Sequence, residues 1–89
     1  MTDYTPIDCG DYDYLEIACM DRYEIEVAHA GGLLVGVADG LETRNGEEFL
    51  CVRLGAQALE AIRVDYIREL RVLSDPARFR RRRFRTSTG

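Results

Sequence analysis

The spacing of apolar and polar residues near the amino terminus predicts an amphipathic helix that begins near Asp11. Its packing face would hold Tyr12, Leu15, Ala18 and Cys19. Its charged face would hold Asp13, Glu16 and Met20. Negative charge suits the first turn of a helix, so Asp11 or Asp13 is expected to cap it. The pattern therefore predicts a helix that packs on one side and exposes acidic residues on the other.

Beyond this helix, alternation of apolar and polar residues predicts five short strands. The first shows the pattern most clearly, because Tyr23, Ile25 and Val27 alternate with two glutamates. The expected strands cover residues 23–30, 33–38, 48–54, 59–64 and 67–73. Strands of this length and spacing are typical of a small barrel, whose closure would leave no free edge and would favour a monomer. The sequence thus predicts a mainly β fold with one amino-terminal helix.

Glycines mark the connections between these strands. Gly31-Gly32 predicts a tight hairpin, while Asp39-Gly40 and Asn45-Gly46 predict turns around a polar connection. Gly36, inside the second strand, predicts a sharp bend or a close approach of another backbone.

The length of 89 residues allows one domain, which we expect to span residues 1–76 because Asp75-Pro76 ends the strand pattern. Residues 77–89 would then form a flexible, disordered basic tail. Alternatively, the arginines and aromatics of this tail could contact RNA or fold back on the acidic body. The arginines available for a nucleic-acid contact are Arg80, Arg81, Arg82, Arg83 and Arg85.

Charge is distributed unevenly along the chain. Residues 1–70 hold fifteen acidic residues and five arginines, a balance of −10, whereas residues 71–89 hold one acidic residue and seven arginines, a balance of +6. The net charge of −4 hides this asymmetry. An acidic body repels nucleic-acid phosphates and attracts the surfaces that bind them. The distribution therefore favours a basic protein surface as the partner of the acidic body.

Residue types that usually carry catalysis or bind metals are few. The cysteines, Cys9, Cys19 and Cys51, include no Cys-x-x-Cys pair, and the single histidine, His29, is distant from them along the chain. We therefore expect buried thiols in a reducing compartment, no catalytic centre, no metal site and no cofactor. No stretch is typical of a membrane span or a secretion signal, so a cytoplasmic protein is expected.

The densest chemical signal lies in residues 4–19, which hold four carboxylates, three tyrosines and no basic residue. They read Tyr-x-Pro-Ile-x-Cys-x-Asp-Tyr-Asp-x-Leu-Glu-x-Ala-Cys and resemble the opening of the Rho-binding antiterminator family, called Rof. Residues 62–67 are similar to the fourth strand of that family. The resemblance implies a small Sm-like barrel that binds the amino-terminal domain of the hexameric termination factor Rho and blocks its primary RNA-binding site. It thereby implies an inhibitor of Rho-dependent transcription termination and not an enzyme.

The same resemblance assigns roles to the matching residues. The expected contacts to Rho are Asp11, Tyr12, Asp13 and Glu16, with Asp8 and Glu24 at the rim. The residues expected to hold the helix against the barrel are Leu15, Ala18 and Cys19. The residues expected to seat the amino-terminal arm are Tyr4, Pro6 and Ile7.

The arginine-rich tail departs from the family pattern and leaves other functions open. An Sm-like RNA-binding module would use the barrel as a scaffold and the tail arginines as its nucleic-acid contact. A plain structural or subunit module would bind neither Rho nor RNA. The charge of the acidic body argues against the RNA-binding alternative.

Overall fold

The computed structural model describes residues 7–84, which form one α-helix, a short 3-10 helix and a six-stranded antiparallel sheet. In chain order the elements are α1 (Cys9–Met20), β1 (Glu24–His29), β2 (Gly32–Arg44), β3 (Glu47–Arg53), β4 (Leu59–Arg63), η1 (Val64–Tyr66), β5 (Ile67–Val72) and β6 (Arg81–Arg83). The strands lie in the order β4-β3-β2-β1-β5-β6, and every neighbouring pair is antiparallel.

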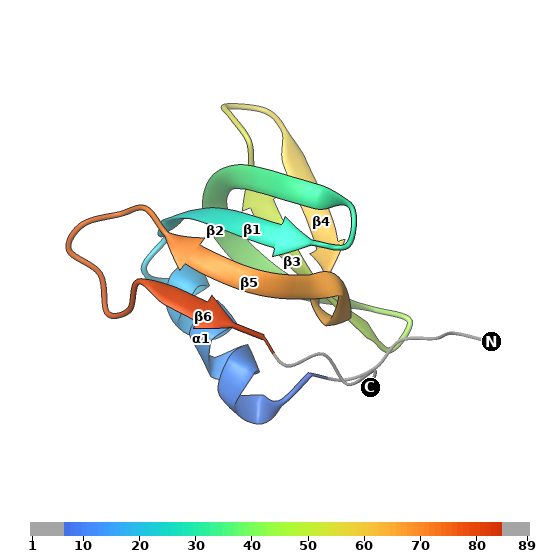
Figure 1. The fold of residues 1–89 in the computed structure, drawn as a ribbon. Helices are drawn as coiled ribbons and strands as arrows, with labels where there is room; N and C mark the ends of the chain where they lie inside the picture. The colour runs from blue at the N-terminus through green and yellow to red at the C-terminus, as the bar shows by residue number, and fades with distance from the viewer. Residues whose placement is uncertain (1–6, 85–89) are drawn as a thin grey trace.

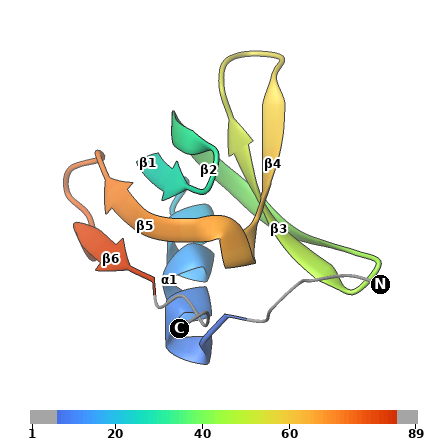
Figure 2. The ribbon, with the colours of Figure 1, turned by 45° about the vertical axis from the view of Figure 1, so that its right-hand side comes forward.

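Helix α1 packs on one side of a strongly curved sheet (Figures 1 and 2). Leu15 and Ala18 of the helix are fully buried in the core. Their fully buried partners from the strands are Ile25, Val27, Ala38, Leu50, Val52 and Leu70. Truncating a side chain such as Leu15 to alanine costs about 2–5 kcal/mol, so the helix is an integral part of the fold.

The predicted faces of α1 are confirmed. Its packing residues are buried or partly buried, and its charged face is exposed. The helix begins earlier than expected, at Cys9, and its cap is Asp8 and not Asp11 or Asp13, because the Asp8 carboxylate accepts a hydrogen bond from the Gly10 amide at 3.1 Å. Within residues 7–84, no helix has the length and apolar character needed to cross a membrane.

The expected ranges of β1, β3, β4 and β5 are confirmed to within one residue at each end. The expected end of β2 is wrong. Asp39-Gly40 does not turn but continues the strand through a bulge, because pairing with β3 extends as far as Arg44. The Asn45-Gly46 turn is confirmed and closes this hairpin with positive φ at both residues.

Gly36 lies where β2 passes close to the end of β3. A Cβ atom at this position would lie 2.5 Å from the carbonyl oxygen of Arg53 and 2.6 Å from Val52 Cγ1. Because no side chain fits at these distances, the expected close backbone approach at Gly36 is confirmed.

The structure does not confirm the five-stranded Sm-like barrel. The sheet has six strands and does not close, so β4 forms one edge and β6 the other. A closed five-stranded barrel would pair β5 with β4, but that side of β5 pairs with β6 instead. The open sheet therefore removes the argument that favoured a monomer.

The expected flexible tail is wrong for residues 77–84, which continue the fold. Arg81–Arg83 form β6 beside β5, and the Phe84 amide donates to the carbonyl oxygen of Arg68 at 2.8 Å. The ring of Phe84 is 4% exposed within the core, and Phe79 packs against the same core. The physical reason is the hydrophobic effect. Burial of these two aromatic side chains is favourable, and it brings the neighbouring arginines against the fold. The expected roles of Arg85, Tyr4 and Pro6 lie outside the described residues, whereas Ile7 packs against the core.

Candidate partner-docking surface

The exposed side of α1 carries two carboxylates and a methionine. Asp13 and Glu16 are exposed, and Met20 is 71% exposed. We call these three residues the acidic face of α1. Asp13 and Glu16 lie three positions apart, so their like charges are neighbours on the helix surface. Within residues 7–84 neither carboxylate has a basic partner, and the face therefore presents uncompensated negative charge.

Asp11 lies on the opposite side of the helix and is only 1% exposed. Arg82 Nε donates a hydrogen bond to Asp11 Oδ1 at 2.8 Å, and the two side chains form an ion pair. This hydrogen bond raises the pKa of the Arg82 guanidinium. The structure thus places Asp11, a predicted Rho contact, inside the fold and apart from the acidic face.

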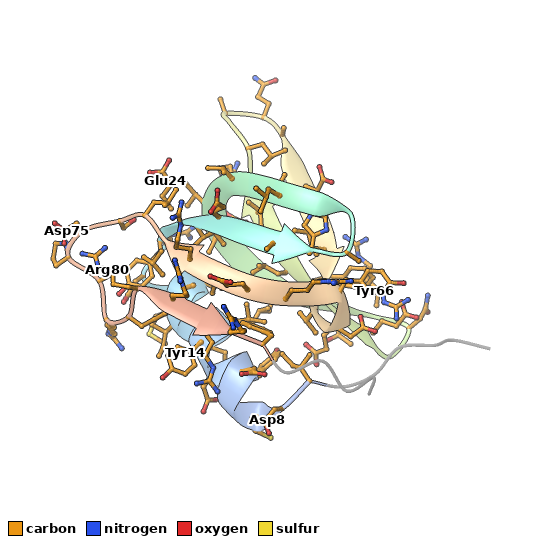
Figure 3. All side chains as sticks on the ribbon, in the orientation of Figure 1. Asp8, Tyr14, Glu24, Tyr66, Asp75 and Arg80 are labelled. Carbon is orange, nitrogen blue, oxygen red and sulfur yellow. The ribbon has the colours of Figure 1, made fainter. Side chains whose placement is uncertain are left out.

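Tyr12 and Asp8 flank the first turn of α1 in different ways. The Tyr12 hydroxyl donates to Glu48 Oε1 at 2.9 Å and so ties the helix to β3. Asp8 is exposed at the amino-terminal end of the helix (Figure 3). Asp8 therefore extends the exposed carboxylates toward the helix start, whereas the Tyr12 hydroxyl is directed toward the sheet.

The arginines of the C-terminal segment pair with carboxylates, and all of the pairs except Arg80–Asp75 reach the acidic body. The ion pairs are Arg78–Asp21 at 3.1 Å, Arg81–Glu69 at 2.9 Å, Arg82–Asp11 at 2.8 Å, Arg83–Glu69 at 4.0 Å and Arg80–Asp75. The alternative in which this segment folds back on the acidic body is confirmed for Arg78 and for residues 81–83. The nucleic-acid contact expected of Arg80, Arg81, Arg82 and Arg83 stays a prediction.

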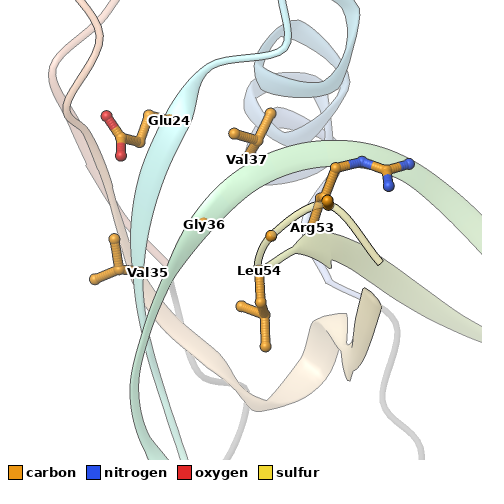
Figure 4. Close-up of a pocket in the computed structure, with 8 residues that line it drawn as sticks. Glu24, Val35, Gly36, Val37, Arg53 and Leu54 are labelled. Carbon is orange, nitrogen blue, oxygen red and sulfur yellow. The ribbon is translucent and has the colours of Figure 1, made fainter. Parts of the chain in front are cut away.

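Glu24, the other predicted rim residue, belongs to β1 and not to α1. It is exposed at the start of β1, and Figure 3 shows it at the far side of the molecule from Asp8. There it borders a shallow groove of about 450 Å³ (Figure 4). Other residues that line the groove are Val35, Gly36, Val37, Arg53 and Leu54. The structure therefore does not bring Glu24 together with the carboxylates of α1.

The known proteins similar to this chain agree with its amino-terminal pattern. The family model for modulators of Rho-dependent transcription termination, Rof, matches residues 6–84. The chain belongs to the Rof family. This membership confirms the resemblance noted in residues 4–19 and makes the chain a regulator of Rho-dependent termination, in a family of modulators and not of enzymes.

A solved structure shares the fold of this Rof-family member. It is YaeO from Vibrio cholerae O395, bound to magnesium, with a TM-score of 0.74 and 24% sequence identity. The likeness covers 83% of this chain and 97% of the other. No curated protein matches the chain. At this level of identity the likeness establishes the fold alone.

The thiols of this Rof-family member differ in environment. Burial raises the pKa of Cys19 to about 12, and burial also raises the pKa of Cys51. Cys9 is exposed at the start of α1, and all three cysteines are free thiols. Within residues 7–84 no cluster of three or more histidine, cysteine or acidic side chains is arranged to hold a metal ion. The raised pKa values make Cys19 and Cys51 poor nucleophiles.

Sequence reasoning located the acidic face but missed Arg82 as the partner of Asp11. The opposite charges of the body and the C-terminal segment were a signal for some such contact. They did not identify the pair, because the two residues are 71 positions apart. Met20 was placed on the charged face by helical spacing, but its contribution of exposed apolar surface to the site was not recognised.

Proposed function

We propose that this Rof-family chain inhibits Rho-dependent termination by docking the acidic face of α1 on the RNA-binding surface of the amino-terminal domain of Rho. A surface that binds RNA phosphates is rich in basic side chains, and carboxylates compete for the same side chains. Occupation of this surface keeps the nascent transcript from loading. The chain thus acts in the cytoplasm as a stoichiometric competitor of RNA.

The observation that carries the proposal is the difference in pairing among the acidic residues of this helix. Asp13 and Glu16 are exposed and have no basic partner within residues 7–84. Asp11 is paired with Arg82, and Asp21 at the helix end is paired with Arg78. Carboxylates without an internal partner can meet a basic surface without first breaking an ion pair of their own. The acidic face is therefore the surface best prepared for such a partner.

Met20 gives this charged surface an apolar component. Its side chain is 71% exposed at the C-terminal end of the helix, in line with Asp13 and Glu16. Methionine is flexible and adapts to partner surfaces of varied shape. In the proposed complex Met20 packs on apolar side chains of Rho, while the two carboxylates set the orientation through charge.

The other predicted contacts take different parts in the proposal. Asp8 extends the docking surface at the helix start, where it is exposed. Asp11 and Tyr12 act by holding the helix through Arg82 and Glu48. Glu24 is left outside the docking surface, because it belongs to β1 and lies on the far side of the molecule from Asp8.

The test is a titration of the purified chain into hexameric Rho, with and without a cytosine-rich RNA, at a low and a high salt concentration. We expect saturable binding that displaces the RNA and weakens as salt rises, because exposed charge pairs are screened. Absence of binding to Rho would contradict the proposal. Retention of the RNA by the chain alone would favour the RNA-binding alternative.

A charge-reversal variant tests the surface itself. Asp13→Lys combined with Glu16→Lys should abolish binding to Rho and leave the circular dichroism spectrum unchanged, because both side chains are exposed. A matched control, Glu24→Lys combined with Glu60→Lys, makes the same change in net charge at exposed strand residues and should still bind. If the folded Asp13 and Glu16 variant binds like the wild type, docking through α1 is ruled out.

A further inference from the structure

Arg82 occupies an unusual position for a charged residue. In the register of β5 and β6 it lies opposite Leu70, which is fully buried. Residues directly opposite each other in antiparallel strands share a face of the sheet, so Arg82 lies on the core side of an edge strand. Its neighbours Arg81 and Arg83 pair instead with Glu69. One arginine of β6 is thus directed toward α1.

Three features of the first turns of α1 surround the Arg82 guanidinium. Its Nε donates to the buried Asp11 carboxylate at 2.8 Å. Its central carbon lies 4.5 Å from the centroid of the Tyr14 ring, at the distance of a cation–π contact. A Cβ atom added to Gly10 would lie 3.4 Å from Arg82 Nη2, so the guanidinium also lies close to the helix backbone. The contact with Asp11 is therefore supported from more than one side.

The Tyr14 ring connects this contact to the rest of the C-terminal segment. Tyr14 and Phe79 pack edge to face with ring centroids 4.8 Å apart, and Phe79 packs in turn on Tyr23 at 6.1 Å. The Tyr23 hydroxyl accepts a hydrogen bond from the Arg78 amide at 2.7 Å. Arg82 and Phe79 thus both contact Tyr14 of the helix, and Phe79 and Arg78 contact Tyr23 beyond the helix end.

The geometry of a helix relates the paired side to the acidic face. With about 100° of rotation per residue, Asp13 lies about 200° and Glu16 about 140° around the helix axis from Asp11. Fixing the direction of Asp11 therefore fixes the direction in which both exposed carboxylates leave the surface. The apolar anchors Leu15 and Ala18 hold the later turns, whereas Asp11, Tyr12 and the packing of Ile7 hold the start of the helix.

We infer that Arg82 is a positioning residue for partner docking: by binding Asp11 from β6, it sets the orientation of α1 that presents Asp13 and Glu16. The inference rests on the proposed function, because it concerns the same docking surface. Arg82 itself does not touch the partner. It couples the C-terminal strand to the surface that the amino-terminal helix displays.

The test compares Arg82→Gln with Arg83→Gln, which removes the same charge from the next residue of β6. Amide hydrogen exchange of α1 is measured in each folded variant, together with the affinity for Rho. We expect Arg82→Gln to accelerate exchange in α1 relative to β1, β2 and β3, and to weaken Rho binding about tenfold. Arg83→Gln should change neither, because the Arg83 side chain is 80% exposed and approaches Glu69 only to 4.0 Å.

The design separates positioning from charge and from general stability. Removing a positive charge should strengthen attraction to a basic partner, so weaker binding of Arg82→Gln cannot arise from net charge. A general loss of stability would accelerate exchange in every strand and not selectively in α1. The double variant Asp11→Asn with Arg82→Gln also removes the buried charge that Arg82 neutralises but does not restore the contact, so we expect its Rho affinity to stay below that of the wild type.

Specific results would overturn the inference. Wild-type Rho affinity in folded Arg82→Gln, or unchanged exchange in its α1, would show that Arg82 does not position the helix. If Arg82→Gln does not fold, Arg82→Lys replaces it, because lysine keeps the charge and loses the planar guanidinium that meets Asp11 and Tyr14. Failure of the wild type to bind Rho would instead overturn the proposed function, and the exchange of α1 would still decide whether Arg82 orients the helix.

Discussion

The two sides of α1 carry the same kind of side chain in opposite environments. Asp11, on the inner side, is 1% exposed and bound to Arg82. Asp13 and Glu16, on the outer side, are exposed and have no basic partner within residues 7–84. Asp11 and Asp13 are separated by a single residue in the sequence. Helical rotation alone sends one of them into the fold and the other to the solvent.

The comparison shows that a cluster of acidic residues need not act as a unit. A buried carboxylate has lost its water and requires a partner within the fold, so its charge contributes to structure. An exposed carboxylate keeps its water and can exchange it for a basic partner. In this Rof-family chain the inner carboxylate organises the helix, and the outer ones are proposed to meet Rho.

The largest expected effect comes from destabilising β6, the strand that carries Arg82, the partner of Asp11. Phe84→Ala removes a side chain that is 4% exposed directly after β6. We expect the free energy of unfolding to fall by about 3–5 kcal/mol, measured by urea denaturation. Leu73→Ala, at a position that is 40% exposed, is the control and should cost less than about 1.5 kcal/mol. Equal losses would show that β6 does not depend on Phe84.

The next prediction compares the same substitution at Asp11, on the inner side of α1, and at Asp13, on its outer side. Asp11→Asn should lower the free energy of unfolding by about 2 kcal/mol, because the hydrogen bond to a charged carboxylate is lost in a buried site. Asp13→Asn should change it by less than about 0.5 kcal/mol and should instead weaken Rho binding severalfold. Thermal and urea unfolding give the first quantity, and calorimetric titration gives the second. Similar stability losses in both variants would remove the distinction between the two sides.

Salt should change the affinity for Rho, which depends on the outer carboxylates, more than the free energy of unfolding, to which the inner Asp11 contributes. Raising ionic strength from about 0.1 to 0.5 M shortens the screening length from about 10 Å to less than half of that. We expect Rho affinity to fall about tenfold, while the free energy of unfolding changes by less than about 1 kcal/mol, since buried pairs are screened less. Parallel titrations and urea curves in the two salt concentrations measure both. Binding that does not respond to salt would mean that apolar contacts, and not the carboxylates, dominate docking.

The smallest effect concerns the thiols on the same helix. With a pKa of about 12 for Cys19, only about one such thiol in ten thousand is ionised at pH 8. We expect a thiol reagent to modify exposed Cys9 first and Cys19 only after unfolding, as followed by mass spectrometry. Because the folded pKa of Cys19 lies above its ordinary value of 9.0, its contribution to stability is complete below pH 9 and is lost as pH rises toward 12. Equally fast modification of both thiols would contradict the burial of Cys19.

Much of the local structure was predictable because it depends on short-range patterns. Helical spacing correctly divided Leu15 and Ala18 from Asp13 and Glu16, and alternation found β1 from Tyr23 and its neighbours. Gly36 was correctly identified as a point of close backbone approach. Each of these predictions follows from the periodicity of one element or from the absence of one side chain.

The failures involve contacts between distant parts of the chain. Four consecutive arginines, Arg80 to Arg83, have no alternation of apolar and polar residues, so periodicity could not predict a strand there. Backbone pairing with β5 makes β6 a strand, and Phe84, the residue that follows it, is buried in the core. The prediction of a closed barrel was wrong for the same kind of reason. Strand β6 pairs with the side of β5 that would have to pair with β4 to close a barrel. Tertiary pairing overrode local propensity in both cases.

The arginines of β6 have a second effect, because β6 forms one edge of the open sheet. An edge strand exposes unpaired backbone groups that can template pairing with other chains, and charged residues at an edge discourage such pairing. Strand β6 is only three residues long, and the side chains of Arg81 and Arg83 are 57% and 80% exposed. If a second molecule paired its own β6 with this edge, its arginines would lie against these arginines, and the like charges would repel. The segment that anchors α1 therefore also protects one border of the sheet from aggregation.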